Sequence, residues 1–134
     1  MEIGPNQRKW IEALRSGKYQ QGRFMLHSAN HRFCCLGVAC DLFAKEREID
    51  FILDDRLAPG RVPCYAYTNT KNAPSTVALP ADVADMLSMD PRGWPVGDGF
   101  QQQLRFLNDI CQWTFHEIAD HIEQNAADYF REPV

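Results

Sequence analysis

The feature that most constrains this chain is its longest apolar run, Phe33-Cys34-Cys35-Leu36-Gly37-Val38-Ala39-Cys40-Asp41-Leu42-Phe43. The run is too short for a membrane span, which needs roughly 20 residues. It predicts instead a helix over residues 35–44 that is apolar on nearly every side and is therefore buried at the centre of the fold. Gly37 lowers the helix propensity by about 1 kcal/mol relative to alanine. A glycine here indicates that another backbone segment, or a ligand, comes close to the helix.

The remaining patterns predict a single α+β domain over residues 1–134, with about four helices and a short antiparallel sheet around the central helix. Two short strands joined by the turn His27–Asn30 form the expected central hairpin, and the sequence Thr114-x-x-Glu117 predicts a capping box. The expected helices cover 5–15, 35–44, 80–89, 101–108 and 115–129, and the expected strands cover 23–26, 31–34, 49–53 and 62–67.

Length and cysteine content place the chain among intracellular globular domains. Its 134 residues are enough to bury a core without disulfides. The five cysteines are odd in number and two of them are adjacent, which is not the pattern of a secreted disulfide framework. The first residues are polar, so we expect no signal peptide. We therefore predict a cytoplasmic protein with reduced thiols and no membrane association.

Charge is unevenly distributed along the chain. The net charge of −4 argues against general nucleic-acid binding. Yet the first 32 residues contain six basic and two acidic side chains. Such a basic segment can hold a small anion. Alternatively, it forms a solvated helix face with ordinary surface arginines.

The basic segment leads to the start of the central helix, and a helix N-terminus with nearby Lys or Arg is a ready anion site. Tyr19, Trp94 and Trp113 offer a stacking surface for a base. The alternative is that Asn108 and Asp109 bond local backbone in a turn. The leading hypothesis is a non-catalytic binding protein for a small anionic, nucleotide-like ligand, without a cofactor. The expected ligand-binding residues are Lys18, Tyr19, Gln21, Gly22, Arg23, Cys35, Asn108 and Asp109.

A metal site is not expected, although His and Cys residues crowd into residues 27–40. The chain has no Cys-x-x-Cys pair, and Cys35 and Cys40 diverge by about 140° around a helix. His116 and His121 are five residues apart, whereas the zinc-protease helix needs histidines four apart.

A cysteine nucleophile is a further alternative, because a helix N-terminus stabilises a thiolate. Cys34 and Cys35 are the candidates. The order Cys-x-Gly followed by an apolar helix weakly resembles the nucleophile helix of NlpC-type cysteine peptidases, which need a downstream histidine. His116 is the candidate base. The competing interpretation is that these cysteines pack as small apolar groups.

Several motifs together resemble a widespread family of short phage and prophage proteins. They span most of the chain except residues 45–78 and include Leu14-Arg15-Ser16-Gly17-Lys18-Tyr19, Cys34-Cys35-Leu36-Gly37-Val38, Leu107-Asn108-Asp109 and the segment from Thr114 to Glu123. The chain is also similar, more distantly, to an actinobacterial domain of unknown function. His116 stands where such proteins often have a small or acidic residue.

The resemblance implies a phage-encoded accessory protein in the host cytoplasm, in the manner of counter-defence factors that sequester a nucleotide signal or bind a host protein. The resemblance identifies no catalytic residue. The alternative to ligand binding is a protein–protein inhibitor. Such an inhibitor would dock through an acidic surface, at Asp54-Asp55 or on the outer face of the last helix.

Overall fold

The computed structural model describes residues 1–54, 63–71, 73–89 and 99–134. Within this part of the chain, six helices and a two-stranded antiparallel sheet form an α+β fold, as predicted. The elements are α1 (Pro5–Arg15), α2 (Cys35–Phe43), a 3-10 turn η1 (Ala44–Arg47), β1 (Asp50–Asp54), β2 (Cys64–Thr68), α3 (Ala81–Met86), α4 (Gly99–Asp109), α5 (Phe115–Gln124) and α6 (Ala126–Tyr129).

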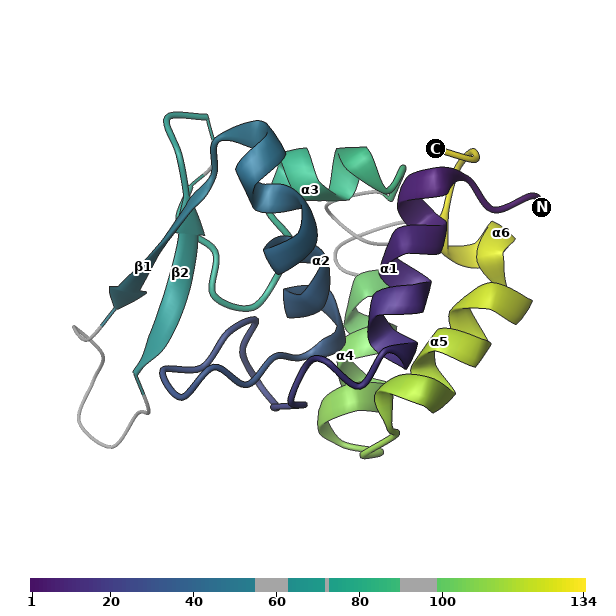
Figure 1. Ribbon diagram of the computed structural model, residues 1–134, viewed down its shortest axis with the longest axis horizontal. Coiled ribbons are helices and arrows are strands. Elements are labelled where there is room, and N and C mark those ends of the chain that lie inside the picture. The colour runs from purple at the N-terminus through teal and green to yellow at the C-terminus, as the bar shows by residue number, and fades with distance from the viewer. Residues whose placement is uncertain (55–62, 72, 90–98) are drawn as a thin grey trace.

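Helix α2 lies at the centre of the molecule, as its composition predicts. Seven of its nine residues are buried. The sheet lies on one side of α2 and helices α1 and α5 lie on the other (Figure 1). Trp10 of α1 is fully buried, and its indole Nε1 donates a hydrogen bond to the carbonyl oxygen of Cys35 at 3.0 Å. Burial of each large side chain in this core contributes roughly 1.5–3 kcal/mol.

Gly37 is explained by close backbone packing. A methyl group on this residue would lie 1.7 Å from the carbonyl oxygen of Leu26. The sequence left open whether a backbone or a ligand approaches the glycine, and the structure shows that a backbone does. The segment that precedes α2 therefore lies directly against the helix.

The sheet pairs residues 50–54 with residues 64–68, close to the predicted ranges of 49–53 and 62–67. Phe51 lies opposite Tyr67 and Leu53 lies opposite Tyr65. Residue 62 lies outside the described part of the chain.

The predicted hairpin of strands at 23–26 and 31–34 is wrong. These segments form only isolated bridges, including His27 with Phe33. Phe24 and His31 adopt positive φ angles of 69° and 58°, which interrupt an extended backbone. The predicted turn does form, since Ser28 N–H donates to the Arg32 carbonyl at 2.8 Å. The result is a folded loop that connects α1 to α2.

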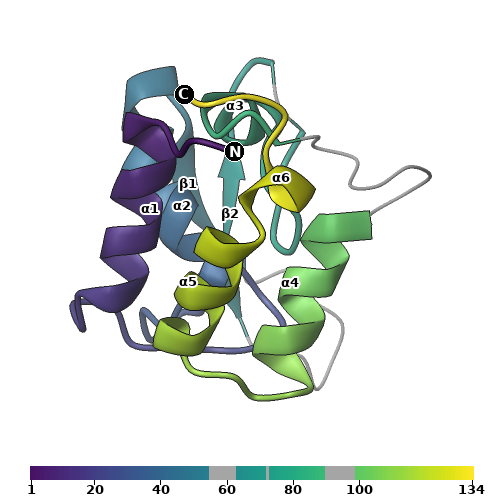
Figure 2. The same ribbon diagram turned by 90° about the vertical axis from the view of Figure 1, so that its right-hand side faces the viewer.

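The C-terminal helix is divided, whereas the sequence predicted one helix to residue 129. Asn125 leaves the helical conformation and separates α5 from α6. The predicted capping box at the start of α5 is confirmed: Thr114 Oγ1 accepts from Glu117 N–H, and Glu117 Oε1 accepts from Thr114 N–H. Figure 2 shows α4 and α5 as neighbours at the opposite side of the fold from α3.

None of the described helices is both long and apolar enough to cross a lipid bilayer. The predicted loop around Trp94 lies outside the described residues.

Candidate functional site

Asn108 joins three segments at the start of α2. Its side chain is fully buried at the end of α4. Its Oδ1 accepts from Gln21 Nε2 at 2.8 Å and from the Cys35 backbone N–H at 3.3 Å. Its Nδ2 donates to the Gly22 carbonyl at 2.9 Å and to Asp109 Oδ1 at 2.7 Å. We call this set of contacts the Asn108 junction.

Five of the predicted ligand-binding residues therefore do meet in space: Gln21, Gly22, Cys35, Asn108 and Asp109. They bond to one another. Gln21 Nε2 also donates to the Trp113 carbonyl at 2.8 Å, so its amide is shared between two acceptors. The carboxamide of Asn108 stands where an anion at the helix N-terminus would accept the Cys35 N–H. Buried polar groups of this kind stabilise a fold when every donor has a partner.

The other three predicted residues, Lys18, Tyr19 and Arg23, are not part of the Asn108 junction. The Tyr19 hydroxyl donates to Asp41 Oδ2 at 2.6 Å, and partial burial raises the pKa of Tyr19. Its ring packs edge-on against Phe33. Lys18 and Arg23 are exposed. The anion-site hypothesis remains a prediction, and any such ligand would have to bind outside the Asn108 junction.

The two candidate nucleophiles are buried thiols. Cys34 is 2% exposed, and burial raises the pKa of its thiol to about 12. Burial also raises the pKa of Cys35, whose Sγ lies 3.7 Å from the Leu104 carbonyl. At neutral pH both groups are neutral thiols, which is unfavourable for nucleophilic attack.

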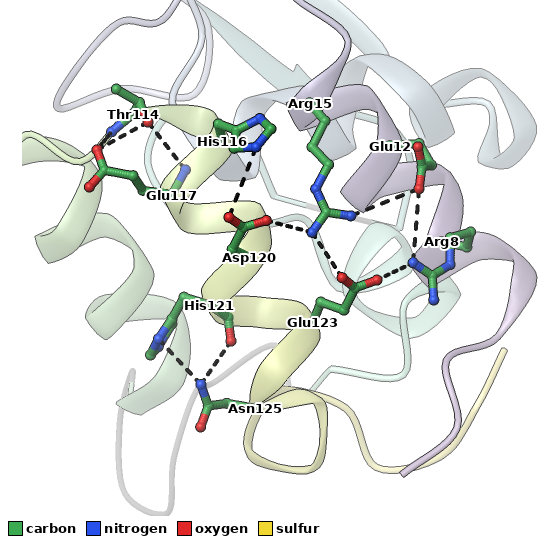
Figure 3. A network of polar contacts seen from close by, with 10 residues as sticks. All are labelled: Arg8, Glu12, Arg15, Thr114, His116, Glu117, Asp120, His121, Glu123 and Asn125. Atoms are coloured by element: carbon green, nitrogen blue, oxygen red, sulfur yellow. Dashed lines mark hydrogen bonds and ion pairs between the residues drawn. The ribbon is translucent and has the colours of Figure 1, made fainter.

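His116 lies on the exposed side of α5, within an ion-pair network between α1 and α5 (Figure 3). Its Nε2 is 3.9 Å from Asp120 Oδ2. Asp120 in turn accepts from Arg15, which also bonds Glu123. Arg8 pairs with the same Glu123. No contact joins His116 to either thiol in the described part of the chain, so the structure does not assemble a nucleophile and a base.

An apolar hollow of about 360 Å³ lies next to the Asn108 junction. Four large apolar side chains around it are between 38% and 60% exposed. They come from three segments far apart in the sequence: Phe24, Val77, and Phe106 with Ile110. Gln102, Arg105 and Asp109 complete the lining. Five of the lining residues belong to α4 or directly follow it, so the hollow runs along two turns of that helix.

Phe24 bears two unfavourable features at once. Its φ of 69° is in the left-handed region, which is uncommon for a bulky residue and costs roughly 1–2 kcal/mol. Its ring is nevertheless 60% exposed. Burial of the ring in the core therefore does not compensate for the backbone strain.

Two anchors hold the loop that carries Phe24. On one side, Asn108 binds the Gly22 carbonyl. On the other side, His27 is buried, and its Nδ1 lies 2.9 Å from the Tyr67 hydroxyl. Leu26 N–H donates to the Thr76 carbonyl at 2.8 Å, which brings the Phe24 segment beside the Val77 segment. The wall of the hollow is thus fixed by hydrogen bonds to three other parts of the fold.

His27 is a buried titratable group in this arrangement. Burial, together with the neighbouring His31 ring, lowers its pKa from 6.5 to about 4. His27 Nε2 lies 2.7 Å from His31 Nδ1, so one ring donates and the other accepts. The His27 ring stacks on Phe33, and the His31 ring stacks on Tyr65. Among the described residues, no three His, Cys, Asp or Glu side chains group together as a metal site would require.

Comparison with known families places this geometry in context. One family model matches residues 5–126, and its description is "Domain of unknown function (DUF8296)". The chain belongs to this family. The DUF8296 match includes the Asn108 junction, the hollow and β1. Neither a curated protein nor a solved structure matches the chain.

The sequence did not indicate the hollow. Phe24 falls within the strand predicted over 23–26, and the helix predicted over 101–108 carries no expectation about Phe106. One signal was available, since Phe106 and Ile110 are four residues apart and follow a different stripe from Leu104 and Asn108. The Phe24 and Val77 contributions carry no local signal, because loops bring them to α4.

Proposed function

We propose that this protein is a binding protein that docks another protein through the apolar hollow beside α4. The observation that carries the proposal is the convergence of four exposed apolar side chains from three segments around one concavity. Contiguous exposed apolar surface of this kind marks interaction sites in soluble proteins. Single exposed apolar residues need no such explanation.

The hollow is also held in shape before any partner arrives. The Asn108 junction and the His27–Tyr67 contact fix the loop on either side of Phe24. Binding to a preorganised surface avoids the entropic cost of ordering a loop. Under this proposal the strained backbone conformation of Phe24 is functional, because it turns the aromatic ring outward toward the partner.

The shape and charge of the hollow indicate one kind of occupant, an amphipathic helix of the partner. Phe106 and Ile110 are one helical turn apart, and so are Arg105 and Asp109. A partner helix of about two turns matches the two turns of α4 along which the hollow runs. It would insert large apolar side chains among Phe24, Val77 and the exposed face of α4. Helix-in-groove docking of this type is a recurring recognition mode.

A phage-encoded accessory protein that acts in the host cytoplasm and inhibits a host protein fits this proposal. The docking surface differs from the acidic one expected at Asp54-Asp55 or on the outer face of the last helix. Nucleotide-like ligand binding is less well supported, because the Cys35 N–H at the start of α2 already bonds Asn108. Hydrolysis by a cysteine nucleophile is disfavoured by the burial of both thiols.

The proposal is tested by a photo-crosslinking residue, p-benzoylphenylalanine, placed at position 106 of the full chain in host cells. We expect one discrete protein adduct, identified by mass spectrometry. The purified partner should then bind the unlabelled chain, and its affinity should fall at least tenfold for Phe106→Glu and for Phe24→Ser. Ala127→Glu is the control, because Ala127 is exposed on α6 and lies outside the hollow.

Binding that is unaffected by both hollow variants, or the absence of any adduct at position 106, would contradict the proposal. So would an adduct with a second copy of this chain, since the hollow would then be an interface between identical subunits. Thermal unfolding of each variant separates loss of binding from loss of fold.

A further inference from the structure

Strand β1 is the second exposed apolar surface, and it lies on the opposite side of α2 from the α1–α5 pair (Figure 1). Its three central residues, Phe51, Ile52 and Leu53, are 45%, 51% and 50% exposed. Among the described residues, β1 pairs with β2 and with no other strand. An edge strand with exposed apolar side chains is a template for pairing with another chain.

Hydrogen bonds on the far side of β2 determine which way the backbone of β1 points. Tyr65 N–H donates to the His27 carbonyl at 2.8 Å, and Tyr67 N–H donates to the Ser75 carbonyl at 2.9 Å. Both amides therefore point away from β1. In an antiparallel pair, directly opposed residues share this orientation. The backbone groups of Phe51 and Leu53, which oppose Tyr67 and Tyr65, consequently point outward from the sheet.

The charges of β1 distinguish between possible occupants. The strand reads Asp50-Phe51-Ile52-Leu53-Asp54, with an acidic residue at each end. In an antiparallel pair with a second copy, centred on Ile52, Asp50 would lie opposite Asp54 of that copy at both ends. Like charges directly opposed across strands are destabilising. A strand with basic residues at both ends meets the opposite charge instead.

We propose that the outer edge of β1 binds an extended segment of another protein that has apolar residues flanked by Lys or Arg. The segment adds a third strand to the sheet and exchanges hydrogen bonds with the backbone of Phe51 and Leu53. This inference does not depend on the hollow beside α4. If both surfaces are used, the protein links two partners.

The probe for this surface is the peptide acetyl-Lys-Val-Ile-Val-Lys-amide, titrated into the isotopically labelled full chain and followed by NMR. Before addition, the Phe51 and Leu53 amides should exchange with solvent faster than the Ile52 amide. During titration, the Phe51 and Leu53 amide signals should shift. Methylation of both valine nitrogens of the peptide should weaken binding at least tenfold, whereas methylation of the isoleucine nitrogen, which points away, should have little effect.

Charge and backbone variants complete the test. A peptide with Glu in place of both lysines should bind at least tenfold more weakly. Leu53→Pro removes one outward N–H at an edge position that tolerates proline, and should also weaken binding at least tenfold. Leu53→Thr keeps that N–H and serves as its control.

The proposal is overturned if the peptide does not bind the wild-type chain, or if the valine-methylated peptide binds as well as the parent. It is also overturned if the free protein sediments as a dimer with protected Phe51 and Leu53 amides. The peptide series remains decisive even if Leu53→Pro fails to fold. Since the hollow is not part of this test, its outcome is independent of the test at position 106.

Discussion

The Asn108 junction and the hollow beside it are built from the same loop and the same helix, yet they differ in which side chains they bury and which they expose. At the junction, polar groups are buried and bond to one another. At the hollow, apolar groups are exposed around a concavity. Buried polar atoms are stable only when paired, and exposed apolar groups gain free energy only when covered. The first region is therefore complete within this chain, whereas the second would be completed by the partner that we propose.

The comparison shows how the two regions depend on each other. The loop 22–27 has one anchor at Asn108 and another at Tyr67, and Phe24 lies between them. Rigid anchors allow a strained and exposed aromatic residue to persist. Changes at the anchors should therefore affect stability, and changes in the hollow should affect binding.

Of the changes at the two anchors, the largest effect is expected for Asn108→Ala. The variant leaves the buried Cys35 N–H and the partly buried Gly22 carbonyl without Asn108, whereas the Gln21 amide keeps the Trp113 carbonyl. We expect the free energy of unfolding to fall by about 2–4 kcal/mol in urea denaturation. The expected change for the control Asn30→Ala, at an exposed residue, is within about 0.5 kcal/mol. A similar small change for Asn108→Ala would show that the junction does not organise the loop.

Acidification should destabilise the fold through the second anchor, His27. The pKa of His27 is about 4 in the folded protein and 6.5 ordinarily, so the unfolded chain binds the proton first as the pH falls. The stabilisation by neutral His27 is complete above pH 6.5 and is lost as the pH falls toward 4, amounting to roughly 2–3 kcal/mol. Urea denaturation across this range measures it.

The matched variant is His27→Phe, which keeps a ring against Phe33 and removes the titration. It should lower stability at pH 7, since the Tyr67 hydroxyl loses its partner. It should also flatten the pH dependence between 6.5 and 4. Arg15 and Arg8 lower the pKa of Glu123 from 4.5 to about 2, so the stabilisation that Glu123 contributes is lost below about pH 4.5, and the comparison above that pH separates His27 from Glu123. An unchanged slope in His27→Phe would refute the assignment to His27.

The smallest effect on stability is expected in the hollow. Ile110 is 57% exposed, whereas Ile118 in α5 is fully buried. Ile110→Ala should change the free energy of unfolding by less than about 0.5 kcal/mol, and Ile118→Ala should lower it by about 2–5 kcal/mol. Thermal and urea denaturation of the two variants measure the difference. A large destabilisation by Ile110→Ala would mean that the hollow is part of the core.

Sequence patterns anticipated the elements that depend on local periodicity. The central helix, the first helix and the capping box were all predicted, and strands were expected at 49–53 and 62–67 but not their pairing with each other. The hairpin at 23–34 was not, because positive φ at Phe24 and His31 interrupts the extended backbone that the apolar pattern predicts. The break at Asn125 was missed because the apolar stripe continues across it to Ala126.

The candidate site, too, could be predicted only in part. The sequence identified Gln21, Gly22, Cys35, Asn108 and Asp109 as a group, and the structure brings them together. It did not reveal that they satisfy one another, since this depends on the orientation of one amide between two loops and a helix.

The sequence by itself determined that a buried helix over residues 35–43 organises a small α+β domain, because only burial accommodates an apolar segment of that length. It also indicated a close approach at Gly37, since a side chain there is sterically excluded. Tertiary structure alone decided that the backbone of Leu26 makes that approach, that Asn108 completes the start of α2, and that Phe24 meets Phe106 and Ile110 at the surface. These contacts join residues up to 87 positions apart, and the patterns used to interpret sequences extend over only a few turns of a helix or strand.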